Sequence, residues 1–290
     1  MRQQEITKER QMRIDTFVDT VNTVENGGYT NSKGKFVAID EIGDSTFVKA
    51  KMTPNFPKER HETEISVVNM DSLLCAKALI DRGLHPAVLN MASWRRPGGY
   101  VEGGSSAQEE NLFRRTNLYE GLFPYHKEMA DRYNFKMDEH DSYPLNLNYG
   151  GIYTPHVTVF KGSDDEEYPY LDEPYFIDVL TVAAVKNPNI LEGNKISEKD
   201  KETTRNKIRT MLNLALMGGN DALVLGAFGC GAYHTPPEEI ALIFKEILSE
   251  EGYKDSFKAV HFAILNSNAN FQKHNPRGNF APFKEIMEGN

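Results

Sequence analysis

The sequence predicts an α/β fold in which helices cover both faces of a mostly parallel sheet, preceded by a helical extension. From residue 65 onward, short and continuously apolar stretches alternate with amphipathic helical ones. This alternation is typical of parallel strands that are buried on both faces. Two glycine-rich stretches each follow an apolar stretch directly. They therefore fall at the carboxyl ends of strands, where such sheets bind ligands.

The first 62 residues show a different pattern. Apolar residues recur at helical spacing between Ile14 and Val21, and the pattern stops at Gly27-Gly28. Residues 36–41 and 45–50 predict a small pair of strands joined by residues 42–44. We therefore predict a helical and strand extension over residues 1–62 that packs on a domain of residues 63–290.

The predicted domain alternates strands and helices along the chain. Strands are expected at residues 64–69, 86–90, 156–160, 175–185, 221–228 and 258–265, and helices at residues 73–80, around 208–215 and from Pro236. Residues 131–175 have no clear period, so we expect a long excursion around the strand at 156–160.

Composition indicates a globular protein of a reducing compartment. Hydrophobic residues make up 39% of the 290 residues and charged residues 26%, and no apolar run has the roughly 20 residues needed to cross a bilayer. The first residues are too polar for a secretory signal. Cys75 and Cys230 are the two cysteines, so we expect no disulfide and a cytoplasmic location.

The formal net charge of −9 disfavours a large surface that tracks nucleic-acid phosphates. A local basic patch of Arg95, Arg96, Arg114 and Arg115 could still meet an anionic ligand. No zinc motif is present. A cation could bind His61 with Glu62 and Glu64, or His140 among residues 138–141, but solvated acidic loops are the favoured interpretation. We expect no metal and no cofactor.

The second glycine-rich stretch carries Gly226, Gly229 and Gly231. Thr235 fits a helix N-cap, with Pro236 at the first helical position and Glu238 three residues after the cap. Backbone N–H groups of such a loop and the positive end of the helix dipole form a phosphate site. A merely tight connection is the alternative, and Tyr233 either stacks on a ligand or covers the helix end.

The first glycine-rich stretch runs into two adjacent acids. Gly98, Gly99, Gly103 and Gly104 precede Ser105-Ser106, and Ser106 with Glu109 fits a capping box. Glu110 has no such structural role, and it lies about 100° further around the helix. The spacing therefore predicts carboxylates that point in different directions, one that positions and one that reacts. The alternative for Glu110 is a first-turn acid favoured by the helix dipole.

Residues 90–119, "NMASWRRPGGYVEGGSSAQEENLFRRTNLY", resemble the catalytic stretch of the microbial-type poly(ADP-ribose) glycohydrolases. That family has a Pro-Gly-Gly-Gly loop followed by Gln-Glu-Glu. Residues 223–241, "LVLGAFGCGAYHTPPEEIA", resemble its second diphosphate loop. The resemblance implies a macrodomain-like fold with three α/β/α layers and a mostly parallel mixed central sheet.

The resemblance also implies roles for the residues of both loops. Glu110 is the implied catalytic acid/base, Glu109 holds the ribose, and Gln108 supports the loop. The residues that surround the diphosphate and distal ribose are Gly98, Gly99, Tyr100, Gly229, Cys230, Gly231, Ala232 and Tyr233. The implied reaction is metal-independent hydrolysis of the O-glycosidic bond of ADP-ribose, carried on protein or on nucleic acid, with no membrane partner.

One departure from the family leaves alternatives open. Tyr100 replaces the third loop glycine, so it narrows the site, stacks on the ligand, or disables turnover and leaves a non-catalytic ADP-ribose reader. A phosphatase that acts on an ADP-ribose derivative is a more distant alternative. Phe271 is an aromatic wall for adenine or a core residue.

Overall fold

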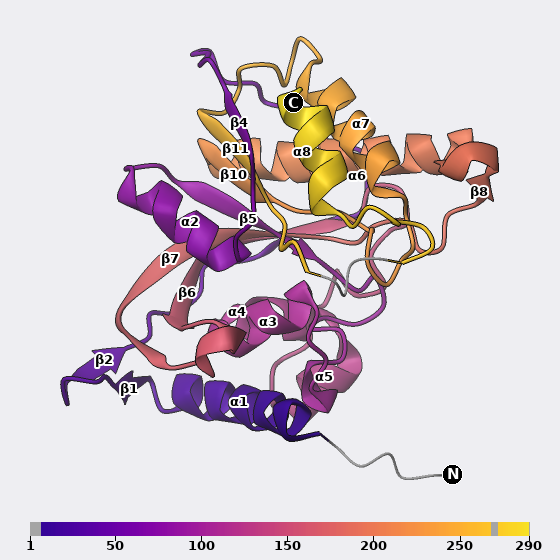
Figure 1. Cartoon of the computed structure of the whole chain (residues 1–290). Helices are drawn as coiled ribbons and strands as arrows, with labels where there is room; N and C mark the ends of the chain where they lie inside the picture. The colour runs from indigo at the N-terminus through magenta and orange to yellow at the C-terminus, as the bar shows by residue number, and fades with distance from the viewer. Residues whose placement is uncertain (1–6, 268–271, 290) are drawn as a thin grey trace, which may run out of the picture. The chain divides into compact units, whose positions relative to one another are not determined.

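The computed structural model describes residues 7–267 and 272–289, which form two compact units (Figure 1). The first unit contains residues 7–45, 95–144 and 154–177, and the second contains the remaining described residues. Strands β6 (Gly151–Lys161) and β7 (Tyr170–Val182) contribute residues to both units. Phe271 lies outside the described residues.

A seven-stranded sheet forms the second unit. Its strand order is β3-β6-β7-β5-β10-β11-β4. The strands not yet given are β3 (Thr46–Val48), β4 (Glu64–Val68), β5 (Pro86–Met91), β10 (Ala222–Leu225) and β11 (Ala259–Ala263). β7, β5, β10, β11 and β4 pair in parallel, and β3 pairs antiparallel with β6. The predicted α/β class with a mostly parallel mixed sheet is confirmed.

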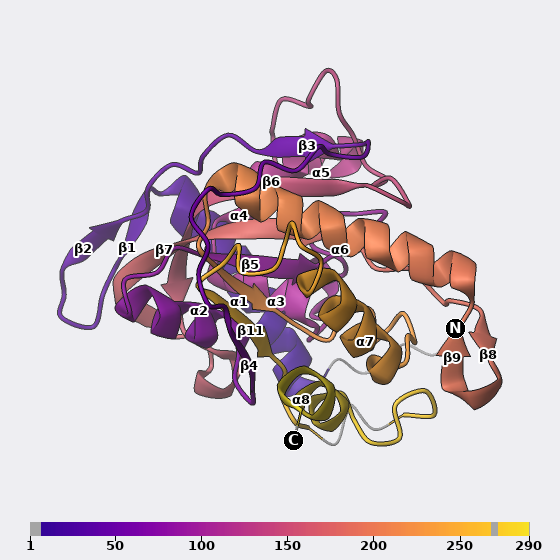
Figure 2. The same cartoon turned by 90° about the horizontal axis from the view of Figure 1, so that it is seen from above.

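Helices cover both faces of this sheet, because alternate strand residues point to opposite sides. Leu223 and Val260 pack with α6 (Glu198–Gly218), α7 (Pro237–Leu248) and α8 (Phe280–Glu288) in one buried cluster. Helix α2 (Ser72–Asp81) contacts β5, β10 and β11, and it lies on the other side of these strands (Figure 1). Viewed from above, α7 lies between α6 and α8 (Figure 2).

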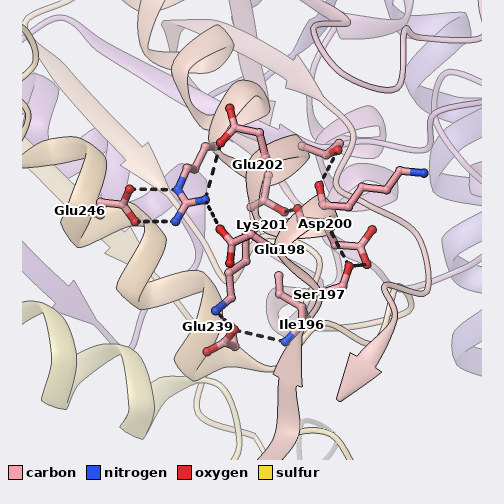
Figure 3. A network of polar contacts seen from close by, with 12 residues as sticks. Ile196, Ser197, Glu198, Asp200, Lys201, Glu202, Glu239 and Glu246 are labelled. Atoms are coloured by element: carbon pink, nitrogen blue, oxygen red, sulfur yellow. Dashed lines mark hydrogen bonds and ion pairs between the residues drawn. The ribbon is translucent and has the colours of Figure 1, made fainter. Parts of the chain in front are cut away.

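Polar side chains fix the start of α6 (Figure 3). Ser197 caps the helix by accepting from the Asp200 N–H, and its hydroxyl donates to the Asp200 carboxylate. A short antiparallel pair, β8 (Ile190–Leu191) with β9 (Lys195–Ile196), leads into this cap. At the other end, Gly219 adopts φ 74° and ends the helix.

The first unit contains the N-terminal helix α1 (Lys8–Glu25) and the short helices that carry the first glycine loop. These are α3 (Gln108–Arg115), α4 (Leu118–Leu122), α5 (Lys127–Arg132) and the 3₁₀ turns η1 (Val101–Gly103), η2 (Phe123–Tyr125) and η3 (Asp164–Glu166). Phe17 of α1 makes edge-to-face contacts with Tyr119, Phe123 and Tyr133. This buried aromatic group joins α1 to α4 and α5.

The predicted pairing of residues 36–41 with residues 45–50 is wrong. β2 (Phe36–Ala38) pairs instead with β1 (Gly28–Thr30), while β3 pairs with β6. Gly28 permits the first pairing because its φ is 153° and a Cβ atom there would lie 2.2 Å from the Val37 carbonyl oxygen. A glycine at residue 28 therefore allows β1 and β2 to approach each other closely.

Within the described residues, no helix combines the length and the hydropathy that spanning a bilayer requires.

Candidate functional site

The two adjacent acids lie in the first turn of α3, and both are buried. Glu109 is 5% exposed and Glu110 is 6% exposed. Helix α3 begins at Gln108, which is half-buried, and Ala107 occupies the N-cap position with no capping side chain. The predicted capping box of Ser106 and Glu109 is therefore wrong.

Each acid accepts a hydrogen bond from the first glycine loop instead. The Gly98 N–H donates to Glu109 Oε1 at 3.0 Å, and the Tyr100 N–H donates to Glu110 Oε1 at 3.0 Å. Between these two donors lies Gly99, with φ 54°. Glycine suits this turn because other residues rarely adopt positive φ.

The carboxylates converge on the loop rather than pointing apart. A Cβ atom at Gly99 would lie 2.6 Å from Glu110 Oε1 and 3.1 Å from Glu109 Oε2. The predicted divergence is wrong because helical spacing describes only the Cα–Cβ direction. A glutamate has two more carbon atoms over which to bend toward a donor.

Of the two Glu110 carboxylate oxygens, one is held by the loop. The other, Oε2, makes no hydrogen bond with any residue that the structure describes. Proton transfer needs a carboxylate that is held in place yet has a free oxygen directed to the reacting group. The anchored Oε1 and the unbonded Oε2 together meet that need.

Arg114 is buried beside this site, although the sequence predicts it in a local basic patch. It is fully buried, and its Nε donates to the Tyr168 hydroxyl while Nη1 donates to the Ser105 carbonyl, both at 2.8 Å. Burial lowers the pKa of its guanidinium, and the charges of Tyr168, Asp164 and Glu110 act in the opposite direction. The sequence signal for this position is the i, i+4 spacing between Glu110 and Arg114, which puts both residues on one face of a helix.

The predicted basic patch does not form as a surface. Arg114 and Arg115 are 0% and 1% exposed. Arg96 is ion-paired with Glu102, whose carboxylate also accepts from Arg132 and from the Tyr133 hydroxyl. Three of the four arginines are therefore engaged within the first unit.

Tyr100 fits its position without backbone strain. Its φ of −117° is open to any L-residue. The ring is 59% exposed and covers Gly103, where a Cβ atom would lie 2.0 Å from Tyr100 Cε1. The replacement of a family glycine by tyrosine thus leaves the turn and the Glu110 hydrogen bond intact.

The second glycine loop belongs to the second unit. Gly229 has φ 78°, and a Cβ atom there would lie 2.8 Å from the Ala184 Cβ. Gly231 and Ala232 are exposed, and their N–H groups have no partner among residues 7–267 and 272–289. Two adjacent, accessible N–H groups suit an anionic oxygen.

Cys230 and Tyr233 occupy different environments in this loop. Cys230 is fully buried, and burial raises the pKa of its thiol well above the ordinary value. The Tyr233 hydroxyl lies 3.4 Å from the Trp94 N–H, which donates to it, and 3.5 Å from the Ala92 carbonyl oxygen. Tyr233 is therefore held beside the carboxyl end of β5. The sequence predicts that both glycine-rich stretches lie at the carboxyl ends of strands.

The predicted start of the following helix is wrong by one residue. Helix α7 begins at Pro237, Pro236 is its N-cap, and Thr235 makes no capping bond there. Thr235 instead donates its N–H to the Gly229 carbonyl. Because neither proline has an N–H group, the helix start has fewer N–H groups than usual that could donate to an anion, and the loop is the better source.

Both cation alternatives have other hydrogen-bonding partners. Asp138 Oδ1 accepts from the N–H groups of His140 and Asp141, and Glu64 bonds to Arg82 and His261. Across the described residues, no three His, Cys, Asp or Glu side chains gather as a metal-binding group.

A family model and solved structures both match this chain. The family described as "Microbial-type PARG, catalytic domain" matches residues 18–162, half of the chain and all of the first loop. No curated protein matches. The second loop lies outside the family match.

Solved structures match over most of the chain. A poly(ADP-ribose) glycohydrolase from Thermomonospora curvata is 25% identical with TM-score 0.73, over 95% of this chain and 99% of that one. The same enzyme bound to the inhibitor ADP-HPD is 26% identical with TM-score 0.72, over 94% and 98%. One from Deinococcus radiodurans with ADP-ribose is 27% identical with TM-score 0.61, over 79% and 86%. The chain belongs to the microbial-type poly(ADP-ribose) glycohydrolase (PARG) catalytic-domain family and is a glycosidase.

Proposed function

We propose that this protein hydrolyses the O-glycosidic bond at the anomeric carbon of ADP-ribose, in poly- or mono-ADP-ribosylated substrates, with Glu110 as general acid and base. Family membership supports the bond type. The relatives crystallised with ADP-ribose and with ADP-HPD support ADP-ribose as the bound group. The proposed chemistry uses the chain's own carboxylates and requires no cofactor or metal.

The observation that carries this proposal is the geometry of Glu110. One carboxylate oxygen accepts from the Tyr100 N–H at 3.0 Å, and the other is unbonded among the described residues. In the proposed reaction Glu110 protonates the departing oxygen while the sugar gains oxocarbenium character. It then accepts a proton from the attacking water.

Glu109 has the positioning role in this proposal. Its Oε1 is held by the Gly98 N–H at 3.0 Å, and the carboxylate is offered to hydroxyl groups of the ribose next to the scissile bond. Burial raises the pKa of the neighbouring Tyr143 hydroxyl, and the negative charge of Glu109 adds to that effect. Tyr143 therefore stays uncharged beside Glu109.

The ligand-binding residues are proposed from both loops, and the first loop contributes Gly98, Gly99 and Tyr100. The exposed N–H groups of Gly231 and Ala232 are offered to diphosphate oxygens. Cys230 contributes its backbone, because its thiol is buried, and Tyr233 covers the distal ribose. Negative charge near a carboxyl group favours its protonated form, so a bound diphosphate also assists a general acid.

A cytoplasmic location belongs to the same proposal. Cys75 and Cys230 are both buried free thiols, which favours a reducing compartment.

The test compares Glu110→Gln with the native protein on ADP-ribosylated substrate. We expect the rate of ADP-ribose release to fall about 10²- to 10⁴-fold, the usual contribution of a general acid/base. ADP-ribose affinity, measured by calorimetry, should change little. Glu128→Gln is the control, because this glutamate is 54% exposed on α5. A native protein that binds ADP-ribose but releases none would be a reader, and release of inorganic phosphate would indicate a phosphatase.

A further inference from the structure

We propose that His274 is a positioning residue for the second glycine loop. Its imidazole holds the Cys230 carbonyl group so that the next N–H group, that of Gly231, is presented to a diphosphate oxygen. This inference rests on the proposed function, in which the loop binds the diphosphate of ADP-ribose. It concerns a side chain that acts through the loop backbone and not by touching the ligand.

The contact between His274 and the loop joins two segments that are far apart in the sequence. The His274 Nε2 atom lies 2.7 Å from the Cys230 carbonyl oxygen. Because a carbonyl oxygen only accepts hydrogen bonds, the Nε2 atom carries the hydrogen and donates it. Both residues belong to the second unit, so the bond ties the loop to the segment that leads into α8.

The peptide group between Cys230 and Gly231 turns this bond into a direction for an N–H group. The peptide is trans, and in a trans peptide the C=O and N–H bonds lie in one plane and point to opposite sides. With His274 on the carbonyl side, the Gly231 N–H points away from the imidazole. Gly231 is exposed, and its N–H has no partner among the described residues.

The next peptide group along the loop is arranged in the same way. The Gly231 carbonyl accepts from the His234 N–H at 3.0 Å. On the other side of that peptide, the Ala232 N–H has no partner within residues 7–267 and 272–289. Two successive peptide groups thus have bonded carbonyl oxygens and unbonded N–H groups, and successive N–H groups of this kind form an anion-binding concavity.

Of these two carbonyl bonds, the first depends on a side chain. The His234 N–H belongs to the backbone, whereas the donor to the Cys230 carbonyl is an imidazole. Across the described part of the chain, His274 alone donates to that carbonyl. Without this bond the peptide group rotates more freely, and ligand binding then includes the loss of that freedom.

His274 is itself held from two sides. Its carbonyl accepts from Asn194 Nδ2 at 3.0 Å. Its ring lies edge-to-face with the ring of His234, with 5.1 Å between the centroids, and His234 Nδ1 is 3.0 Å from Asn187 Oδ1. A donor whose own position is fixed keeps its acceptor in one orientation.

The test measures the affinities of inorganic pyrophosphate and of ADP-ribose by calorimetry on the full chain. His274→Ala should weaken both about tenfold or more, the usual contribution of a hydrogen bond to a charged group, because the Gly231 N–H is no longer oriented. His274→Gln should stay within about threefold of the native protein, since glutamine also carries a side-chain N–H donor. This rescue separates the role of the donor from that of the ring.

His85→Ala is the matched control. His85 lies in the same unit, just before β5, and its Nε2 is 3.0 Å from Asp178 Oδ2. This variant removes a histidine hydrogen bond at the amino ends of the strands, whereas the loop follows the carboxyl end of β10. Both affinities should therefore stay within about twofold. An equal fall in the two alanine variants would mean a general loss of stability and would overturn the inference.

Amide signals of the loop give a second measurement, which needs no variant. In ¹H–¹⁵N spectra of the native protein, the Gly231 and Ala232 signals should shift as pyrophosphate is added, with the dissociation constant that calorimetry gives. Signals that do not respond while pyrophosphate binds would place the anion elsewhere and overturn the inference.

Failure of the proposed function gives a different result. If the native protein binds ADP-ribose but hydrolyses no ADP-ribosylated substrate, the proposed reaction fails, and the affinities still decide the role of His274. If it binds neither ADP-ribose nor pyrophosphate, the assignment of the loop fails and the inference fails with it. Equal affinities in native protein and His274→Ala, or equal losses in His274→Ala and His274→Gln, overturn the inference while the proposed function stands.

Discussion

Gly99 is the residue at which a single added methyl group would disturb both acids. Its φ is 54°, and the added Cβ would lie 2.6 Å from Glu110 Oε1. Gly99→Ala should therefore displace the carboxylate and lower kcat about 10- to 100-fold, since a misplacement near 1 Å has such effects on catalysis. Initial rates of ADP-ribose release measure this loss.

Gly83→Ala separates the clash from backbone strain. Gly83 has φ 79°, and no atom lies within 4 Å of its Cβ position. Both alanine variants should lose about 1 kcal/mol of folding free energy from positive φ, but Gly83→Ala should keep its activity. Equal losses of activity in the two variants would mean that contact with the carboxylates is irrelevant.

At this scale the sequence predicted where the two acids lie but not how they are held. The Gln-Glu-Glu triplet placed Glu109 and Glu110 in the first turn of a helix, as observed. Their partners, the N–H groups of Gly98 and Tyr100, lie ten or more residues earlier. Local capping rules describe contacts within four residues. They predict that Glu109 binds the backbone at Ser106, whereas the N–H group of Gly98 binds it instead.

Among the elements, long apolar stretches were predicted better than short edge strands. β5 and β10 lie where continuous apolar runs predicted them, because burial on both faces leaves little choice of residue. β2 and β3 have three residues each. For such short strands, closeness in sequence does not predict the pairing partner, since a strand as distant as β6 offers an edge as well.

The domain boundary expected between residues 62 and 63 stays a prediction.

Glu239 ties three elements of the second unit together. It lies in the first turn of α7, and its Oε2 accepts from the Ile196 N–H of β9 and from Lys201 of α6, both at 3.2 Å (Figure 3). The side chain is 9% exposed. Glu239→Ala should lower the free energy of unfolding by about 1–3 kcal/mol, because the buried Ile196 N–H loses its acceptor. Urea denaturation measures the change.

Glu246 gives the comparison on the same helix. Its carboxylate accepts two hydrogen bonds from Arg205, but it is 48% exposed (Figure 3). Exposed pairs contribute little, so Glu246→Ala should cost less than about 1 kcal/mol. A larger loss for Glu246→Ala than for Glu239→Ala would show that surface ion pairs, and not the buried acceptor, hold α6 to α7.

For the molecule as a whole, stability should depend on the protonation of one buried lysine. Lys207 of α6 is 2% exposed, and its Nζ donates to the Asn146 carbonyl at 3.2 Å. Burial lowers the pKa of Lys207 from 10.5 to about 8. The unfolded chain therefore binds this proton more tightly than the native state does between these pH values, so stability should rise with pH across that interval.

Comparison with Lys207→Met isolates this contribution. The methionine variant loses the bond to Asn146 at every pH, but it has no proton to release. Between pH 7 and 9.5 the native protein should therefore gain about 2 kcal/mol of unfolding free energy relative to the variant. Lys136→Met, with a side chain that is 84% exposed, removes one positive charge without burial and should track the native protein. A difference between native protein and Lys207→Met that does not vary with pH would mean that Lys207 stays charged and solvated, and that its burial costs the fold little.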